Sequence, residues 1–263
     1  MSILFENVYK RFGDKIVLDD VSFKVKPGEI LFILGKSGMG KSVTLKHIIG
    51  VLAPDAGKIT VDSMVVSSMQ GVMRDQLDQV RQKCGMVFQH PALIDSLTIF
   101  ENIAFGLRTQ QYQEKMKSEV TEEMISDIVH DKLALVHLNP EILQLFPFEV
   151  SYGVQKRVSM ARTLAPEPAY LLFDEPTTGL DPLSISSINE LIFELSRKLK
   201  VTSIIVSHDM ACALSIADQI LFLDQGKILL MATPGEVMKS TIPLVQDFFK
   251  ETKELLPPNW SLS

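Results

Sequence analysis

Hydrophobic and polar positions along the first sixty residues predict strands joined by tight turns. β-Branched and aromatic residues fill 8–12 and 16–25, and Gly13-Asp14 between these runs predicts a hairpin. Residues 29–34 (EILFIL) are continuously apolar after Glu29, which is typical of a strand buried on both faces. The pattern also predicts a helix and a further strand, over 42–51 and around 58–61.

From about residue 100 the pattern becomes helical and then returns to strands. Charged faces at helical spacing predict helices over 101–108, 114–137 and 155–164. Apolar strands follow at 170–173, 202–206, 219–223 and 228–231. Strands alternating with helices predict an α/β core with a helical subdomain inserted in its middle. An amphipathic helix is expected from Ile242, packed either on the same domain or on a neighbouring copy.

Composition and charge narrow the class of protein. The 263 residues are 46% hydrophobic and 22% charged, as in a globular chain, and their formal net charge is −6. The acidic balance argues against a protein that coats nucleic acid. Two distant cysteines do not make a disulfide scaffold or a zinc site. The N-terminus lacks the pattern of a signal peptide, and we expect no membrane span. The mean hydropathy of +0.18 is compatible with a deep core or with a docking face.

A complete phosphate-loop pattern carries the strongest chemical signal. It runs from Gly35 to Ser42 (GKSGMGKS), between the apolar run and a predicted helix. Its glycines allow backbone amides to point at phosphate oxygens, and Lys41 would reach the β- and γ-phosphates while Ser42 ligates Mg²⁺. The candidate phosphate-binding residues are therefore Gly35, Lys36, Ser37, Gly38, Met39, Gly40, Lys41, Ser42 and Val43.

An acidic pair ends the apolar strand at 170–173. We assign Asp174 to Mg²⁺ and Glu175 to the general base that activates the attacking water. A lone Asp-Glu is usually a solvated strand end, but together with a complete phosphate loop it indicates nucleotide hydrolysis.

Four further segments appear in a characteristic order. They are Gln89 after an apolar strand, residues 150–154 (VSYGV) before a helix, residues 178–181 (TGLD) after the acidic pair, and residues 207–209 (SHD) after the next strand. In this order the chain resembles the nucleotide-binding domain of ATP-binding-cassette (ABC) proteins over nearly its whole length. The resemblance implies a P-loop NTPase (RecA-like) core, over about 1–99 and 165–240, with a helical subdomain over about 100–164. Residues 241–263 are expected to form a C-terminal extension to the 1–240 cassette.

The resemblance also implies roles for single residues. Phe12 is similar to the aromatic residue that stacks on adenine, with Tyr9 a weaker candidate. Gln89 resembles the glutamine that ligates Mg²⁺ and senses the transporter, and His208 resembles the histidine that contacts the γ-phosphate. Ser151 and Gly153 resemble the residues of the family's signature motif, which contact the γ-phosphate across a head-to-tail dimer of two copies. Asp181 resembles the Asp of the family's D-loop.

Three positions depart from the family pattern. Tyr152 and Val154 stand where the signature usually has Gly and Gln, and Val43 stands where many relatives have Thr. The Tyr152 side chain is expected to crowd a close backbone approach and to slow hydrolysis without abolishing it.

Three fragments, 40–50, 88–108 and 206–218, resemble the ATPase of the Mla/MCE lipid-transport systems of bacterial envelopes. This resemblance implies phospholipid movement between inner and outer membranes, at the cytoplasmic face of the inner membrane. The implied partners are a membrane permease, an MCE-domain protein and a small STAS-domain regulator. The apolar residues after Gln89 are expected to receive the permease.

Other functions remain open at this stage. The ATPase of an amino-acid-type importer shares much of the same sequence. A soluble ABC ATPase of DNA repair or translation usually has two cassettes, long insertions or zinc cysteines, which this sequence lacks, and a GTPase would need a guanine-reading segment. His130 and His137 are expected to be structural.

Overall fold

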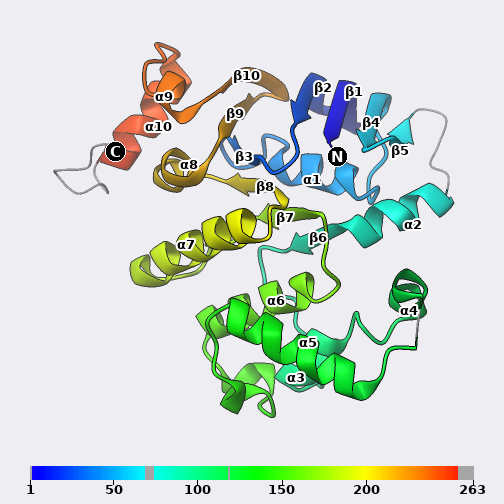
Figure 1. The fold of residues 1–263 in the computed structure, drawn as a ribbon. Helices are drawn as coiled ribbons and strands as arrows, with labels where there is room; N and C mark the ends of the chain where they lie inside the picture. Colours follow the sequence, from blue (N-terminus) through cyan, green and yellow to red (C-terminus); the bar gives the residue numbers. More distant parts are fainter. Residues whose placement is uncertain (1, 69–73, 118, 254–263) are drawn as a thin grey trace. The chain divides into compact units, whose positions relative to one another are not determined.

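The computed structural model describes residues 2–68, 74–117 and 119–253 (Figure 1). The chain divides into two compact units, Met1–Arg81 with Lys200–Ser263 and Gln82–Leu199, and each is described by itself. The two compact units do not test the boundaries expected for the core, the helical subdomain and the C-terminal extension. Those boundaries stay a prediction.

An antiparallel sheet occupies the start of the first unit. Its strands, in spatial order, are β2 (Lys15–Val25), β1 (Ile3–Phe12), β4 (Ala56–Val61) and β5 (Met64–Ser68). The hairpin prediction is confirmed, because Phe12 pairs with Lys15 across the Gly13-Asp14 turn. Stacked rings of Phe5 and Phe23, 4.4 Å apart between centroids, join β1 to β2 on the buried face.

A second set of strands surrounds the apolar run near the N-terminus. β3 (Ile30–Leu34) lies between the parallel strands β8 (Thr202–Ser207) and β9 (Gln219–Asp224), and β10 (Lys227–Ala232) pairs antiparallel with β9. All five residues of β3 are buried, as the unbroken apolar run predicts. The glycine-rich loop therefore leaves the carboxyl end of a central strand.

Short helices accompany these strands. They are α1 (Lys41–Ile48), α8 (Met210–Ile216), α9 (Pro234–Val237) and α10 (Pro243–Lys253), and α2 (Arg74–Lys83) leads out of the unit. α1 ends three residues before its predicted end because Gly50 takes a positive φ and its amide bonds to the carbonyl of His47. The predicted tail helix packs on its own unit: the Phe248 ring meets Phe222 of β9 edge-on at 5.7 Å.

The second unit combines two parallel strands with five of the α-helices in the described part of the chain. β6 (Cys84–Val87) pairs with β7 (Tyr170–Asp174). The helices are α3 (Ile99–Ala104), α4 (Gln110–Met116), α5 (Glu122–Leu135), α6 (Tyr152–Leu164) and α7 (Pro182–Lys198), with 3₁₀ turns at Pro140–Ile142 and Pro147–Glu149. The α/β class is confirmed.

Helix boundaries in this unit correct the sequence predictions. The single helix expected over 114–137 is wrong: α4 ends where Lys117 takes a left-handed conformation, and the Thr121 side chain caps the start of α5 by accepting from the amide of Met124. The helix expected over 101–108 begins earlier and ends at Ala104. The helix expected over 155–164 begins at Tyr152, because Ser151 caps it.

Candidate nucleotide-binding site

The glycine-rich loop is held so close to its neighbours that two of its positions have no room for a side chain. A Cβ atom on Gly35 would lie 2.3 Å from the carbonyl oxygen of Leu223 in β9. At Gly40 the φ is +99°, and a Cβ there would lie 2.6 Å from the carbonyl oxygen of Val17 in β2. Only glycine fits both positions, and the backbone amides of glycine-rich loops of this kind bind phosphate oxygens.

Lys41 is the first residue of α1, and its ammonium lies along the loop. It is 7% exposed, and its Nζ donates to the carbonyl of Gly35 at 2.8 Å and to that of Lys36 at 3.2 Å. No side chain caps the N-terminus of α1, whose cap residue is Gly40. The uncapped first turn of α1 and the Lys41 ammonium thus both lie at the glycine-rich loop, which is the arrangement of a phosphate site.

The predicted aromatic residue lies at the end of β1. Phe12 is 46% exposed, with the Nζ of Lys10 at 5.3 Å from its ring centroid. Beside it, a cavity of about 230 Å³ is lined by Tyr9, Lys10, Arg11, Asp14, Ile16, Leu18 and Asp55. Leu18 also touches the phosphate loop, since a Cβ on Gly40 would lie 3.1 Å from its Cδ2. The hairpin and the phosphate loop are therefore neighbours.

His208 follows β8 at the same edge of the strands as the phosphate loop. Ser207, the residue before it, pairs with Leu34, the residue before Gly35. The His208 side chain is exposed, and Asp209 fixes the turn by accepting from the amide of Cys212 at 2.9 Å. Within the first unit, His208 and the hairpin that carries Phe12 thus each lie beside the predicted phosphate loop.

In the second unit, the acidic pair ends β7. Asp174 is the last residue of the strand and is 8% exposed. Glu175 takes a left-handed conformation with φ +48°, which is unusual for a residue with a side chain and often marks a functional site. The Oε2 atom of Glu175 lies 3.5 Å from the Thr178 hydroxyl, and the Glu175 carbonyl accepts a hydrogen bond from the Thr178 amide at 3.2 Å.

Gln89 follows β6, and the chain holds it through its backbone. Its carbonyl accepts from Nζ of Lys156, a completely buried residue of α6, and lies 3.5 Å from the Tyr152 hydroxyl. Burial lowers the pKa of Lys156 to about 8. The Gln89 side chain itself is exposed. Because β6 and β7 run parallel in register, with Val87 beside Phe173, Gln89 and Asp174 lie at the same strand edge.

The predicted signature residues begin α6. Ser151 is its N-cap, with Oγ accepting from the amide of Val154 at 3.4 Å. Gly153 lies in open surroundings: a Cβ there would meet nothing closer than the Ser184 hydroxyl at 3.8 Å. The Tyr152 hydroxyl lies 3.3 Å from Nδ1 of His90.

Asp181 has a local role that the sequence analysis did not anticipate. Its side chain caps α7, accepting from the amides of Leu183 and Ser184 at 3.1 Å each. Its pKa is lowered, first by the hydrogen bond from the Ser184 hydroxyl. It therefore fixes the turn that leads from the acidic pair into α7.

The oxygen donors fit a magnesium ion better than a softer metal. Ser42, Gln89 and Asp174 offer a hydroxyl, an amide carbonyl and a carboxylate, which are hard ligands suited to Mg²⁺. Within the described residues no three or more His, Cys, Asp or Glu side chains form a metal cluster. Oxygen ligands of these kinds suit Mg²⁺, an ion that often shares its coordination with phosphate oxygens.

Three structurally important residues escaped the sequence analysis. Lys10 and Asp55 join β1 to the segment after α1, and Lys156 holds the turn at Gln89. The only sequence signal was the Pro-Asp-Ala-Gly turn that contains Asp55. Nothing in the local pattern marks either lysine.

A buried strand, a glycine-rich loop and an ammonium at a helix start define a P-loop nucleotide-binding protein. The family model described as ABC transporter matches residues 18–178, more than half of the chain. The chain belongs to the ABC transporter family and is an ATPase whose ATP hydrolysis is coupled to transport.

Two curated relatives and one solved structure illustrate the similarity. The intermembrane phospholipid transport ATP-binding protein MlaF of Haemophilus influenzae is 36% identical over 93% of this chain and 89% of its own. A sulfate/thiosulfate import ATP-binding protein of Cucumis sativus is 35% identical over 97% of this chain and 69% of its own. A dimeric ATP-binding cassette, MJ0796, bound to ADP and Pi after hydrolysis, has a TM-score of 0.77 at 28% identity, over 88% of this chain and 98% of its own.

These findings confirm the ABC-type α/β fold and the ATPase activity. In the described part of the chain, no helix is both long and apolar enough to cross a bilayer.

Proposed function

We propose that this chain powers a lipid transporter of a bacterial envelope, bound to a membrane permease at the cytoplasmic face of the inner membrane. The similarity to the phospholipid-transport protein MlaF carries this proposal. The resemblance of residues 88–108 to the same group supports it, because this segment contains Gln89, where a permease would be sensed, and the residues after it. The further partners are an MCE-domain protein, a STAS-domain regulator and a second copy of the chain.

The loop residues and Lys41 bind the phosphates of ATP in this proposal. Lys41 exchanges its bonds to the carbonyls of Gly35 and Lys36 for bonds to β- and γ-phosphate oxygens. The exposed ring of Phe12 stacks on the adenine. Ser42, Gln89 and Asp174 would hold Mg²⁺, which when bound neutralises charge on the phosphate oxygens.

Glu175 acts as the general base. It follows the last residue of β7 in a left-handed backbone conformation, and its carboxylate orients the attacking water and accepts its proton. His208 donates a hydrogen bond to the γ-phosphate as negative charge grows on its oxygens. Ser151, Gly153 and Asp181 complete the site of the second copy, which is why we expect a homodimer.

The cargo is tested by isolating the assembled transporter. The tagged full-length chain is purified from gently solubilised membranes and its partners are identified by mass spectrometry. Recovery of a permease together with an MCE-domain protein is the expected result. A permease with a soluble solute-binding protein would overturn the lipid proposal and leave the ATPase assignment intact.

Small-solute import is the second candidate, because the sulfate/thiosulfate relative is similar to the same extent. The two candidates differ in what stimulates ATP hydrolysis by the reconstituted complex. A lipid transporter hydrolyses ATP in lipid vesicles without a solute-binding protein, whereas an importer requires the loaded binding protein for full turnover.

A further inference from the structure

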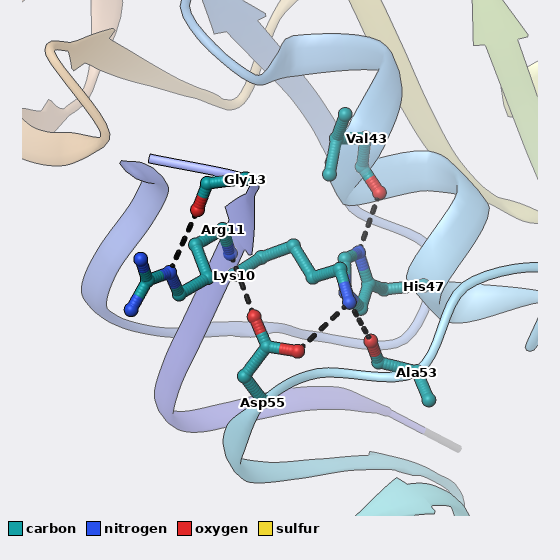
Figure 2. Close-up of polar contacts among 7 residues, drawn as sticks. All are labelled: Lys10, Arg11, Gly13, Val43, His47, Ala53 and Asp55. Atoms are coloured by element: carbon teal, nitrogen blue, oxygen red, sulfur yellow. Dashed lines mark hydrogen bonds and ion pairs between the residues drawn. The ribbon is translucent and has the colours of Figure 1, made fainter. Parts of the chain in front are cut away.

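One carboxylate holds the end of β1 from two sides. The side chain of Asp55 accepts the backbone amide of Arg11 at 2.7 Å through Oδ2 and the ammonium of Lys10 at 3.0 Å through Oδ1 (Figure 2). The backbone amide of Asp55 donates to the carbonyl of Tyr9 at 2.8 Å. Three consecutive residues of β1 are thus bonded to this single aspartate.

These bonds lie where the regular strand pairing stops. The pairing of β1 with β4 ends at Tyr9 and Ala56, so the last residues of β1 have ladder partners only in β2. That remaining ladder is irregular, with register shifts on both sides of Lys10. The Asp55 side chain therefore supplies, on the β4 side, the hydrogen bond that a continuing strand would have supplied to Arg11.

Lys10 connects the same aspartate to two further elements. Its Nζ donates to the carbonyl of Ala53 at 2.8 Å, in the segment that follows α1, and lies 5.3 Å from the centroid of the Phe12 ring. The Lys10 side chain is only 13% exposed, so most of it is shielded from water. One lysine thus contacts the segment after the phosphate-binding helix and the exposed aromatic ring.

The charges favour this arrangement. The hydrogen bond from the Arg11 amide, followed by that from Lys10, lowers the pKa of Asp55, so the carboxylate is ionised at neutral pH. Hydrogen bonds to ionised groups are shorter and stronger than neutral ones. The ammonium over the Phe12 ring also favours one ring position through its attraction to the π face.

We propose that Asp55 and Lys10 are positioning residues for nucleobase recognition: they hold the Phe12 ring at a set place relative to the phosphate loop. The inference rests on the proposed stacking of Phe12 on adenine and adds the residues that orient it. Without the pair, the end of β1 is free on one side and the ring samples other positions. The base then loses stacking, while the phosphates keep their contacts with the loop.

The test compares two probes on the purified full-length chain by titration calorimetry. ATP reports base and phosphate contacts together, and inorganic tripolyphosphate reports the phosphate contacts alone. Removing the stacking ring itself in Phe12→Ala should weaken ATP binding by about tenfold or more. Asp55→Ala and Lys10→Met should each weaken it by a part of that, about three- to tenfold, with tripolyphosphate affinity unchanged.

The double variant sharpens the result. Because the two single variants both remove the same ion pair, Asp55→Ala with Lys10→Met should lose less ATP affinity than the two single losses multiplied together. Asp55→Asn keeps an acceptor for the Arg11 amide but loses the charge facing Lys10, so its ATP affinity should lie between wild type and Asp55→Ala. It also serves as the readout should Asp55→Ala fold poorly.

A second ion pair that involves β1 provides a matched control. Lys58 of β4 and Glu6 of β1 form an ion pair at 3.0 Å, well away from Phe12. Glu6→Ala and Lys58→Met should leave the affinities for both probes unchanged.

The outcomes separate this inference from the proposed base site. Unchanged ATP affinity in Asp55→Ala, or an equal loss for both probes, overturns the positioning role. If Phe12→Ala binds ATP like wild type, the stacking role of Phe12 fails and the inference fails with it. If Phe12→Ala weakens ATP binding and Asp55→Ala does not, only the inference is overturned.

Discussion

The ring of Tyr152, at the start of α6, lies against Gly179 in the turn that follows the acidic pair. A Cβ atom on Gly179, whose φ is +84°, would lie 3.3 Å from Cε1 of Tyr152. The Tyr152 hydroxyl reaches toward the Gln89 carbonyl and His90. A bulky side chain in the signature is therefore accommodated by contacts within its own unit.

The tyrosine should nevertheless slow turnover. Its ring adds bulk where the phosphate of a second copy would approach α6, so Tyr152→Gly should raise ATPase turnover of the assembled complex by about two- to tenfold, a barrier change of no more than about 1.4 kcal/mol. Steady-state phosphate release measures this. Tyr152→Phe keeps the ring and should match wild type. Equal rates for wild type and Tyr152→Gly would remove the crowding hypothesis.

Glu175→Gln should abolish most hydrolysis while sparing ATP binding. The amide cannot accept the proton of water, and general-base catalysis contributes about 10²–10⁴ in rate, so turnover should fall by that factor. ATP should then accumulate in a stable dimer, which size-exclusion chromatography detects. Substantial steady-state turnover in this variant would place the base at another residue. Glu190→Gln, a change of the same kind within α7, is the control.

Gly35→Ala should destabilise the fold without any nucleotide present. The added methyl would overlap the Leu223 carbonyl, and relief of such overpacking typically costs about 1–3 kcal/mol. Chemical denaturation of the two proteins measures the loss. Gly235→Ala is the control, since nothing lies within 4 Å of a Cβ there and the change should stay within about 0.5 kcal/mol. A Gly35→Ala protein as stable as wild type would contradict the prediction, because it would show that the loop and β9 have room for the added methyl group.

Buried His47 should make stability fall in mild acid. Burial lowers its pKa below 6.5, so the unfolded chain binds the proton more readily than the folded one. The stabilisation is therefore present above the unfolded pKa and is lost as pH falls toward the lower folded pKa. Denaturation at about pH 7.5 and about pH 5.5 should show a larger loss for wild type than for His47→Gln.

His130 provides the matched control for this experiment. Both histidines donate from Nδ1, at 2.7 Å, to the carbonyl four residues earlier, which is that of Val43 for His47 and that of Ser126 for His130. His47 is buried and His130 is exposed. His130→Gln should keep the wild-type pH dependence, and the same slope in His47→Gln and wild type would contradict the prediction.

The sequence predicted elements best where one local signal was sufficient. The apolar run of β3 and the Gly13-Asp14 hairpin are observed as expected, because strand burial and turn chemistry are encoded in a few adjacent residues. Helix ends were less predictable. The break between α4 and α5 depends on a left-handed Lys117 and a Thr121 cap, and neither interrupts the amphipathic pattern. Helices α7 and α8 were not anticipated, although Asp181-Pro182 is a start signal.

Sequence by itself determined the chemistry of this protein: a phosphate loop, an acidic pair and the motifs that accompany them need particular residue types in a particular order. Tertiary structure decided which residues support that chemistry. Asp55 reaches Lys10 and Arg11 from more than forty positions away, and Lys156 reaches Gln89 from 67 positions away. Such contacts leave no mark in local periodicity, because they arise only when packing brings distant backbone groups to one buried or half-buried charge.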